Sequence, residues 1–286
     1  MEIRNHYHGA GKLWTRTCIS KDSGFRVASV IVVGNEHTVL IDTQWTLANA
    51  HRVLAEILEI GKPLQYIYLS HAHPDHYFGT KVFTDAFPEA KVYADPDDIA
   101  VVTEQFLPKL DHWQSEIGIL NCPHEAFDII PLPEAYLMLD GERIEMTYKV
   151  WGDLKWNSRV YIPSIKTVIC SDIVFSEAHP FTCEVSPRGR KKWLEELETI
   201  RALGAEVIIP GHAKEDMPFD ETGLNFTRDY LIATDEVLAQ TQDEHAFFHE
   251  METRFFDAKL RKSNAMNANV ILGGLEWNWN DTDVDE

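Results

Sequence analysis

The sequence contains few positive charges and few cysteines. Lys and Arg total 26 against 46 Asp and Glu, so the formal net charge is -20 at pH 7. A surface of that sign repels phosphate backbones and anionic headgroups, so we expect no nucleic-acid partner and no membrane partner. Four scattered cysteines without a C-x-x-C pair argue against a disulfide framework and against a cysteine-ligated zinc site.

Long apolar runs are also missing. No stretch of about 18 apolar residues occurs, so no segment is expected to span a bilayer. The first residues, MEIRNHYHGAGKLW, lack the apolar core of a signal peptide. We therefore expect a cytoplasmic protein that acts on a small molecule.

The first third of the chain alternates strand and helix signals. Residues 25–33 and 38–42 flank the turn signal Gly34-Asn35, which predicts a hairpin. Residues 47–60 place their apolar side chains on one helical face, and Gly61 ends that helix. A further strand is expected over residues 63–70.

The second half repeats this alternation. Strands are expected over residues 144–151, 158–163, 167–172 and 205–212, and Ser186-Pro187 predicts a helix start. Two such halves predict a sandwich of two sheets with helices outside. Apolar residues at helical spacing follow Pro218, so we expect a catalytic domain over 1–217 and a helical extension over 218–286, packed on the same domain. The acidic end of that extension is expected to fray.

The stretch YLSHAHPDHYFGT, residues 68–80, concentrates potential metal ligands at a predicted strand end. In an extended chain, residues two apart point the same way, so His71 and His73 can bind one ion. Asp75 and His76 follow Pro74 and diverge, so they can address a second ion. Burying four such groups without a function would be costly, and the stretch therefore predicts a metal centre.

Other predicted strands also end on residues that can bind a metal. The strand ends are Asp42, Gly152-Asp153, Ser171-Asp172 and Gly211-His212. Loops at strand ends are where a rigid scaffold positions functional side chains. If these ends converge, Asp172 can bridge two ions. Mixed imidazole and carboxylate ligation is typical of zinc, and also of iron or manganese.

These motifs, in this order, resemble those of the metallo-β-lactamase superfamily over about residues 25–215. The resemblance implies an α/β fold, the αββα four-layer sandwich, here with the C-terminal helical extension. It also implies two divalent metal ions, with zinc expected ahead of manganese or iron. One ion would be held by His71, His73 and a third histidine, the other by Asp75, His76 and His212, with Asp172 as the bridge.

The expected third histidine is replaced by Asp153, which follows Gly152. Two interpretations stay open: Asp153 binds the first metal, which we favour, or it points away and the first site is weak or empty. Ligation by Asp153 would make the ion pair less positive and would favour harder ions such as manganese or iron.

The resemblance and the residues together predict a hydrolase. Serine and cysteine nucleophile motifs are missing, so a metal-bound hydroxide is the expected nucleophile, acting on an ester, lactone or related acyl bond. Asp75 or Asp172 would hold the attacking water, and Tyr77 would donate to the oxyanion. Three residues just past the strand ends are expected to line the substrate pocket: Trp45, Trp156 and His179.

Several alternatives stay open at this point. β-Lactamase, thioesterase and phosphodiesterase activities belong to the same superfamily. An iron-dependent oxidoreductase or dioxygenase on this fold is the first rival, and a non-catalytic protein that holds a single metal is the second. A homodimer also stays open, as does the role of the C-terminal helices.

Overall fold

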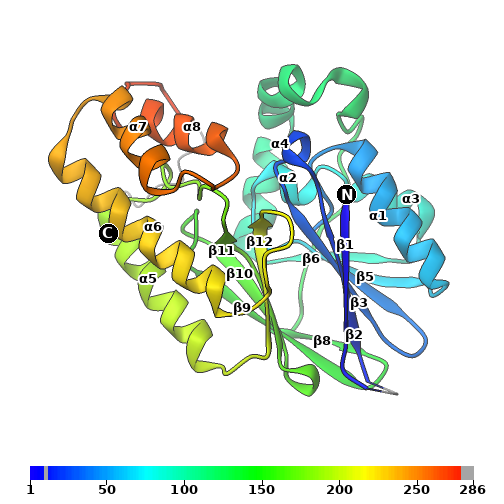
Figure 1. Cartoon of the computed structure of the whole chain (residues 1–286). Helices are drawn as coiled ribbons and strands as arrows, with labels where there is room; N and C mark the ends of the chain where they lie inside the picture. The colour runs from blue at the N-terminus through cyan, green and yellow to red at the C-terminus, as the bar shows by residue number, and fades with distance from the viewer. Residues whose placement is uncertain (10–11, 278–286) are drawn as a thin grey trace. The chain divides into compact units, whose positions relative to one another are not determined.

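Two compact units make up the chain in the computed structural model, which describes residues 1–9 and 12–277 (Figure 1). Unit 1 comprises Met1–Tyr148 and Ser158–Thr167, and unit 2 comprises Lys149–Asn157 and Val168–Glu286. The boundary expected after residue 217 falls inside unit 2, because the C-terminal helices cluster with the strand that carries Asp172. The acidic end that we expect to fray lies outside the described residues from position 278 on.

The sheet of unit 1 is mixed and has seven strands in sequence order. The first four pair antiparallel and the last four pair parallel, with β4 shared between the two sets. The predicted hairpin is confirmed, since Val33 pairs with Thr38 across the turn. The strands are β1 (Glu2–Tyr7), β2 (Trp14–Ile19), β3 (Ala28–Val33), β4 (Thr38–Ile41), β5 (Leu64–Tyr68), β6 (Lys91–Ala94) and β7 (Ile130–Pro131).

Four helices follow the parallel strands of this sheet. They are α1 (Leu47–Ile60), α2 (Pro74–Tyr77), α3 (Thr80–Ala86) and α4 (Pro96–Ile117). The predicted bounds of α1 are confirmed: the Thr46 hydroxyl caps its first turn, and Gly61 ends it with φ 73°. Figure 1 shows α1 and α3 on the same side of the strands, and apolar residues of α1, α3 and α4 share one core cluster with β2–β6.

Unit 1 also holds β8 (Tyr136–Leu139) and most of β9 (Glu142–Val150) and β10 (Asn157–Ile162), which are neighbours in that order. Asp140, in the β8–β9 turn, accepts hydrogen bonds from the backbone amides of Glu36 and His37 at 2.7 and 3.2 Å. This carboxylate therefore ties the β8–β9 turn to the β3–β4 turn. The short 3₁₀ segments are η1 (Asp22–Gly24), η2 (Ile119–Asn121) and η3 (Pro163–Ile165).

Unit 2 contains two strands and four helices in its described residues. Its elements are β11 (Thr167–Ser176), β12 (Val207–Ala213), α5 (Pro187–Ala202), α6 (Glu221–Gln240), α7 (Glu244–Arg254) and α8 (Arg261–Ile271). The predicted strand at Thr167 is confirmed and continues to Ser176, and all of its residues are buried. Trp193 on α5 donates its indole N–H to the Ile173 carbonyl at 2.8 Å, which fixes the helix on β11.

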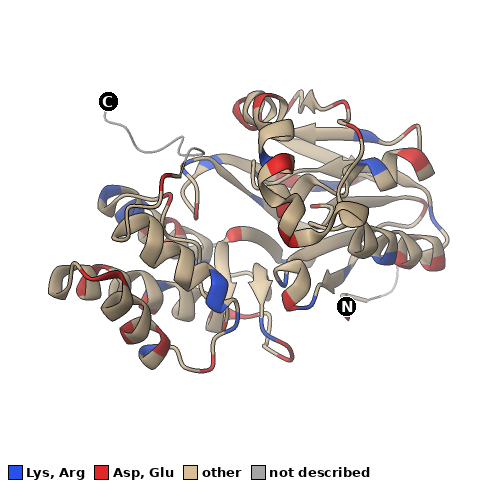
Figure 2. Cartoon of the chain, turned by 90° about the horizontal axis from the view of Figure 1, so that it is seen from above, with Lys and Arg blue, Asp and Glu red and all other residues tan. Residues whose placement is uncertain are grey.

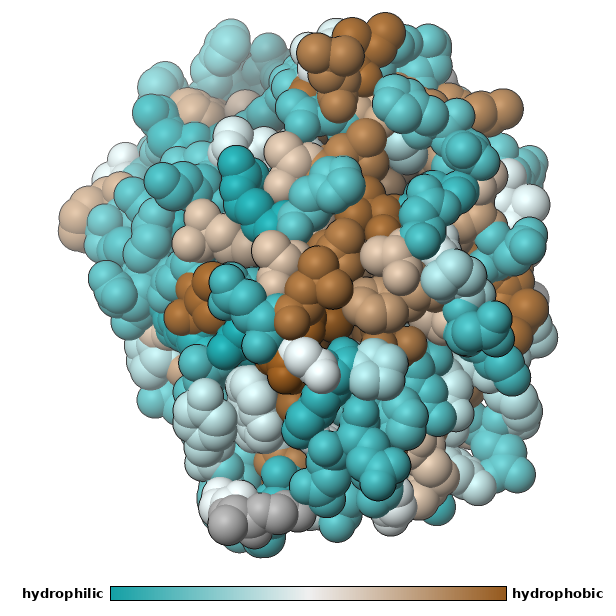
Figure 3. All heavy atoms as spheres, turned by 90° about the vertical axis from the view of Figure 1, so that its right-hand side faces the viewer, coloured by the Kyte–Doolittle hydropathy of each residue, from teal (hydrophilic) through white to brown (hydrophobic). Residues whose placement is uncertain are grey.

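The surface carries the negative charge in dispersed form. Figure 2 shows acidic residues distributed along the helices of both units. Figure 3 shows a band of apolar side chains on one face, and the most exposed large apolar residues of unit 1 include Leu107, Ile119 and Leu120. Within the described part of the chain, no helix combines the length and the apolar character that crossing a membrane requires. All four cysteines are buried, and none of them forms a disulfide.

The cap at the start of α5 gives a direct test of the fold. Ser186 accepts a hydrogen bond from the Gly189 amide at 3.1 Å. Replacing Ser186 by Ala should lower the free energy of unfolding by about 1 kcal/mol, because the amide loses its partner. Urea unfolding followed by circular dichroism measures this. Ser186→Thr keeps the hydroxyl and should stay close to wild type; equal losses in the two variants would contradict the cap.

Candidate metal centre

In unit 1, two parallel strands bring the first group of predicted ligands together. Ile41 of β4 lies beside Tyr68 of β5, and the Asp42 amide donates to the Tyr68 carbonyl at 3.0 Å. The carboxyl ends of parallel strands share one edge of a sheet, so the residues that follow them meet there. Asp42 thus lies next to the segment of residues 70–76.

The Asp42 carboxylate organises this edge. Its Oδ1 accepts from the Ser70 amide at 2.9 Å, and its Oδ2 accepts from the Ser70 hydroxyl and from His76 Nδ1, both at 2.8 Å. Asp42 itself adopts φ 59°, in the left-handed region, and its side chain is buried. Such backbone strain persists only where the surroundings fix it, and it concentrates at functional sites.

These contacts set the tautomers of two histidines. The Ser70 hydroxyl donates to Asp42, so it can accept from His71 Nδ1, which lies 2.9 Å away. His76 also uses Nδ1 as a donor, toward the carboxylate. In both rings the proton is therefore on Nδ1 and the lone pair is on Nε2. A metal binds to the nitrogen that carries the lone pair. Histidine ligands usually donate their other N–H to such a second group.

The remaining residues of the motif complete the group in unit 1. A ligand atom of His71 lies within 4.8 Å of one of His73, and Asp75 Oδ2 lies 3.7 Å from His76 Nε2. His71 and His76 are fully buried, and the Asp75 side chain is 14% exposed. Pro74 starts the short helix α2 between the two pairs, as the predicted bend requires.

A second loop holds α2 in place, and sequence reasoning missed it. The Thr43 amide and hydroxyl both donate to the His76 carbonyl, at 2.7 and 3.0 Å, and the Gly79 amide donates to the Gln44 carbonyl. A Cβ at Gly79 would come within 1.9 Å of the Thr43 carbonyl oxygen, so only glycine fits there. The glycine that follows the histidine motif was the available signal.

In unit 2, β11 and β12 bring Asp172 and His212 together. Their Oδ2 and Nε2 atoms lie 3.0 Å apart, and the imidazole stacks on Phe175 at 5.1 Å between ring centroids. A Cβ at Gly211 would come within 2.1 Å of Asp172 Oδ1, so this glycine makes room for the carboxylate. Both side chains are almost fully buried.

Asp153 lies beside Asp172 in the same unit. The Asp153 amide donates to the Asp172 carbonyl at 3.2 Å, and its Oδ1 accepts from Asn157 Nδ2 at 3.3 Å. A carboxylate oxygen of each aspartate lies within 4.8 Å of the other, and both side chains are buried. Two buried carboxylates this close repel each other unless a cation or a proton compensates them. Asn157, whose amide also donates to the Leu154 carbonyl at 3.3 Å, was not predicted.

The donor sets of both units fit a divalent metal. Unit 1 offers imidazole nitrogens whose tautomers are fixed, with one carboxylate, and unit 2 offers two carboxylates and an imidazole. Nitrogen and oxygen ligands of this kind are typical of zinc, manganese and iron sites.

Tyr77 and Trp45 lie in the core of unit 1. The Tyr77 ring is near those of Phe78, Phe106 and Phe127, at 5.2 to 6.4 Å between centroids, and burial raises the pKa of its phenol. Trp45 is 5% exposed and makes edge-to-face contacts with Phe25 and Trp113. Packing therefore accounts for both side chains, and their functional roles stay predictions.

Trp156 and His179 belong to unit 2. The ammonium groups of Lys155 and Lys149 lie 4.8 and 5.5 Å from the Trp156 ring centroid. His179 is fully buried, with Nδ1 3.1 Å from the Tyr230 hydroxyl and Nε2 3.2 Å from Glu252 Oε1. Burial lowers the pKa of His179 to about 4, although Glu252 opposes this shift. His179 thus joins β11 to α6 and α7, and a pocket role for either residue stays a prediction.

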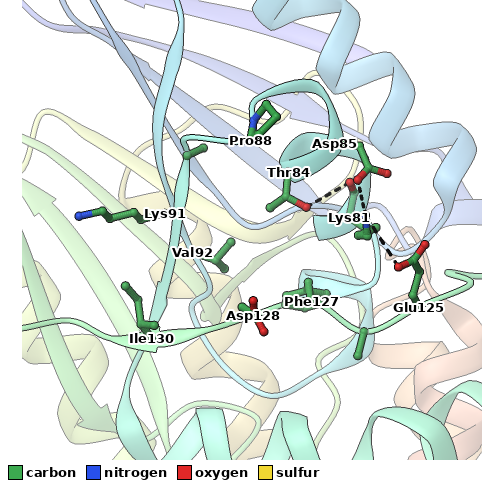
Figure 4. A pocket seen from close by; sticks show the side chains of 12 residues that line it. Lys81, Thr84, Asp85, Pro88, Lys91, Val92, Glu125, Phe127, Asp128 and Ile130 are labelled. Atoms are coloured by element: carbon green, nitrogen blue, oxygen red, sulfur yellow. Dashed lines mark hydrogen bonds and ion pairs between the residues drawn. The ribbon is translucent and has the colours of Figure 1, made fainter.

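A hollow of about 590 Å³ in unit 1 is formed by other residues (Figure 4). It opens between α3, β6 and the segment before β7, and charged side chains such as Lys81, Asp85, Lys91 and Glu125 line it together with apolar ones. Lys81 contacts both Asp85 and Glu125. None of the predicted metal ligands is among its lining residues.

Comparison with protein families decides the identity of the fold. The model of the metallo-β-lactamase superfamily matches residues 23–212, about two thirds of the chain. The chain belongs to the metallo-β-lactamase superfamily. The predicted α/β sandwich with C-terminal helices is thereby confirmed, and superfamily members bind divalent metals, typically zinc.

Two curated relatives are similar to this chain. A linear primary-alkylsulfatase from Pseudomonas sp. (strain ATCC 19151) is 23% identical over 259 residues, which cover 79% of this chain and 46% of the sulfatase. A probable metallo-hydrolase from Streptococcus pyogenes serotype M6 is 27% identical over 149 residues, which cover 51% of this chain and 61% of that protein. The chain thus spans about half to three fifths of the length of these relatives.

Solved structures agree on the fold. The DIM-1 metallo-β-lactamase matches with a TM-score of 0.59 and 20% identity, over 81% of this chain and 97% of that one. A metallo-β-lactamase from Pontibacter korlensis matches with a TM-score of 0.57 and 18% identity, over 81% of this chain and 99% of that one. Identity at this level supports the fold and does not extend to the substrate.

The role of Asp42 predicts a loss of metal affinity in Asp42→Asn. An amide has one acceptor oxygen and a donor NH2 group, so it cannot accept all three bonds from the Ser70 amide, the Ser70 hydroxyl and His76, while asparagine tolerates the left-handed backbone. Zinc affinity should fall by about 10- to 100-fold, as for other residues that orient metal-binding histidines. Competition against a chromophoric chelator measures the Kd. The exposed Asp85→Asn serves as control, and an unchanged Kd in the Asp42 variant would refute the role.

Proposed function

We propose that this protein is a metal-dependent hydrolase that cleaves an ester, lactone or related acyl bond in a small molecule. Membership of the metallo-β-lactamase superfamily supports hydrolysis in general. The observation that carries the proposal is the Asp42 network, in which His71 and His76 both present Nε2 as the metal-binding atom. A protein that had lost its metal would have no need for buried histidines fixed in this tautomer.

We assign the metal ligands residue by residue. His71 and His73 would hold a first ion together with Asp153, Asp75 and His76 would hold a second together with His212, and Asp172 would bridge. Support comes from the pairs inside each unit and from the motif order along the chain. Asp153 is buried, oriented by Asn157 and close to Asp172, which favours its role as a ligand over an orientation away from the metal.

Divalent ions bound there would lower the pKa of a coordinated water and polarise the scissile carbonyl. The chain's own residues then have distinct tasks. Asp75 is the least buried acid of the group and is the best placed to accept a proton at Oδ2. Asp42 and Ser70 keep the imidazoles oriented. The buried phenol of Tyr77, whose pKa is raised, fits packing better than donation to an oxyanion.

A sulfate ester is the second candidate substrate. The similarity to a linear primary-alkylsulfatase favours it, although the chain spans 46% of that protein. Phe25 and Trp113, which are half-buried and pack on Trp45 beside the loop of Asp42, offer apolar surface of the kind that binds alkyl or ring groups. Turnover of dodecyl sulfate but not of lactones or activated esters would replace the acyl-bond proposal by this one.

Metal content and substrate range also separate the remaining rivals. Stoichiometric redox-active iron, seen by elemental analysis and an absorption spectrum, would favour an oxidoreductase or dioxygenase. About one tightly held ion per chain, without turnover of any ester, lactone, sulfate ester or phosphodiester, would favour a binding protein. Hydrolysis of a chromogenic phosphodiester alone would point to a phosphodiesterase.

Replacement of Asp153 by Ala tests the ligand assignment. Bound metal should fall by about one ion per chain, and hydrolysis should fall with it, because the first ion loses its carboxylate. Mass spectrometry of metal content and a lactone assay measure the two effects. Asp229→Ala removes an exposed acid of the same unit and serves as control. If metal content and rate both survive in the Asp153 variant, the assignment is wrong.

A further inference from the structure

Helix α4 packs one side against the loops that carry the ligands of unit 1. Phe106, Lys109 and Trp113 recur at helical spacing, so they lie on one face. Phe106 lies 5.8 Å from the Phe78 ring and 6.3 Å from the Tyr77 ring, on the helix of the histidine motif. Trp113 meets Trp45, which follows Asp42 by three residues, at 5.5 Å. Between these two aromatic contacts lies Lys109.

Lys109 is a buried lysine with a specific contact. It is 3% exposed, and its Nζ donates to the carbonyl oxygen of Ala72 at 2.7 Å. Ala72 stands between His71 and His73 in the sequence, and all of these residues belong to unit 1. Removing an ammonium group from water is costly. Packing of α4 alone would be served better by an apolar side chain such as methionine.

The contact acts on the backbone between the two histidines. The Ala72 carbonyl belongs to the planar peptide group that joins Ala72 to His73. A hydrogen bond to this oxygen fixes the orientation of that plane, and with it the backbone angles on either side that direct the His73 side chain. A charged donor makes such a bond shorter and stronger than a neutral one. The 2.7 Å distance agrees with a charge-assisted bond.

The same ligand segment is thus held from two sides. Asp42 and Ser70 act on the His71 ring through Nδ1, whereas the Lys109 contact acts on the main chain that follows. The hydrogen bonds of Asp42 and Ser70 reach the rings of His71 and His76, whereas the Lys109 contact reaches the peptide group before His73. A fixed Ala72 carbonyl therefore adds a constraint on the direction of His73.

We propose that Lys109 is a positioning residue that holds the His71–Ala72–His73 segment in the geometry required to bind a metal. The inference rests on the proposed function, since it assigns the segment a metal. Its role is separate from ligation, because an ammonium group cannot bind a cation. Burial raises the pKa of the nearby Asp98 carboxyl, and the Lys109 ammonium opposes this shift. The positioning role is therefore tested by metal affinity in protein that remains folded.

Zinc titration of the full-length protein tests the proposal, with Kd measured by competition against a chromophoric chelator. Lys109→Met fills the same space without a donor and should weaken zinc binding by about tenfold, in the range known for residues that orient metal ligands. Lys109→Arg keeps a charged donor and should have a Kd between those of Lys109→Met and wild type. Lys91→Met makes the same change at an exposed site beside the hollow of Figure 4 and should match wild type.

The outcomes separate this inference from the proposed function. If the wild-type protein binds neither zinc nor manganese, the proposed function is refuted, and the inference is refuted with it. A wild type that binds zinc and hydrolyses its substrate, with an unchanged Kd in folded Lys109→Met, overturns the inference alone. If the Met variant gives no cooperative thermal transition, Lys109→Leu, which also lacks a donor, takes its place, with the same expected loss and the same contradicting result.

Discussion

One buried carboxylate, that of Asp42, determines the chemistry of the candidate metal centre. It accepts three hydrogen bonds, two from Ser70 and one from His76, and through the Ser70 hydroxyl it also orients His71. These bonds fix the tautomers of both imidazoles. The backbone of unit 1 accepts positive φ at Asp42 and Gln44 in order to place this loop. This strained backbone persists because the loop donates hydrogen bonds to the Tyr68 carbonyl of β5 and to the His76 carbonyl of α2.

Much of this arrangement could be predicted from the sequence. Strand ends that carry Asp42, the histidine motif, Asp172 and His212 follow from local patterns, because a strand and its final polar residue are neighbours in the chain. The hairpin at Gly34 and the bounds of α1 follow from turn and cap residues in the same way. Local patterns do not show which strand ends lie next to one another, because that depends on the fold.

Other features depend on contacts between distant segments. Helix α4 was missed although Asp95-Pro96 is a standard helix start, because Pro108 and Lys109 interrupt its apolar pattern in mid-helix. Lys109 acts on Ala72 across 37 positions of sequence, and Thr43 acts on the His76 carbonyl across 33. Nothing local distinguishes such a lysine or threonine from one on the surface. Asn157 could not be predicted either, because its relevance comes from its hydrogen bond to the Asp153 carboxylate.

The central claim is that the Asp42 network holds His71 and His76 with Nε2 ready to bind a metal. The most direct test is a crystal structure of the zinc-loaded protein with diffraction data collected on both sides of the zinc absorption edge. Anomalous peaks are expected at about 2.0–2.1 Å from Nε2 of His71 and of His76, with each Nδ1 still bonded to Ser70 or Asp42. Peaks that lie away from both histidines, or next to Nδ1 in place of Nε2, would contradict the claim.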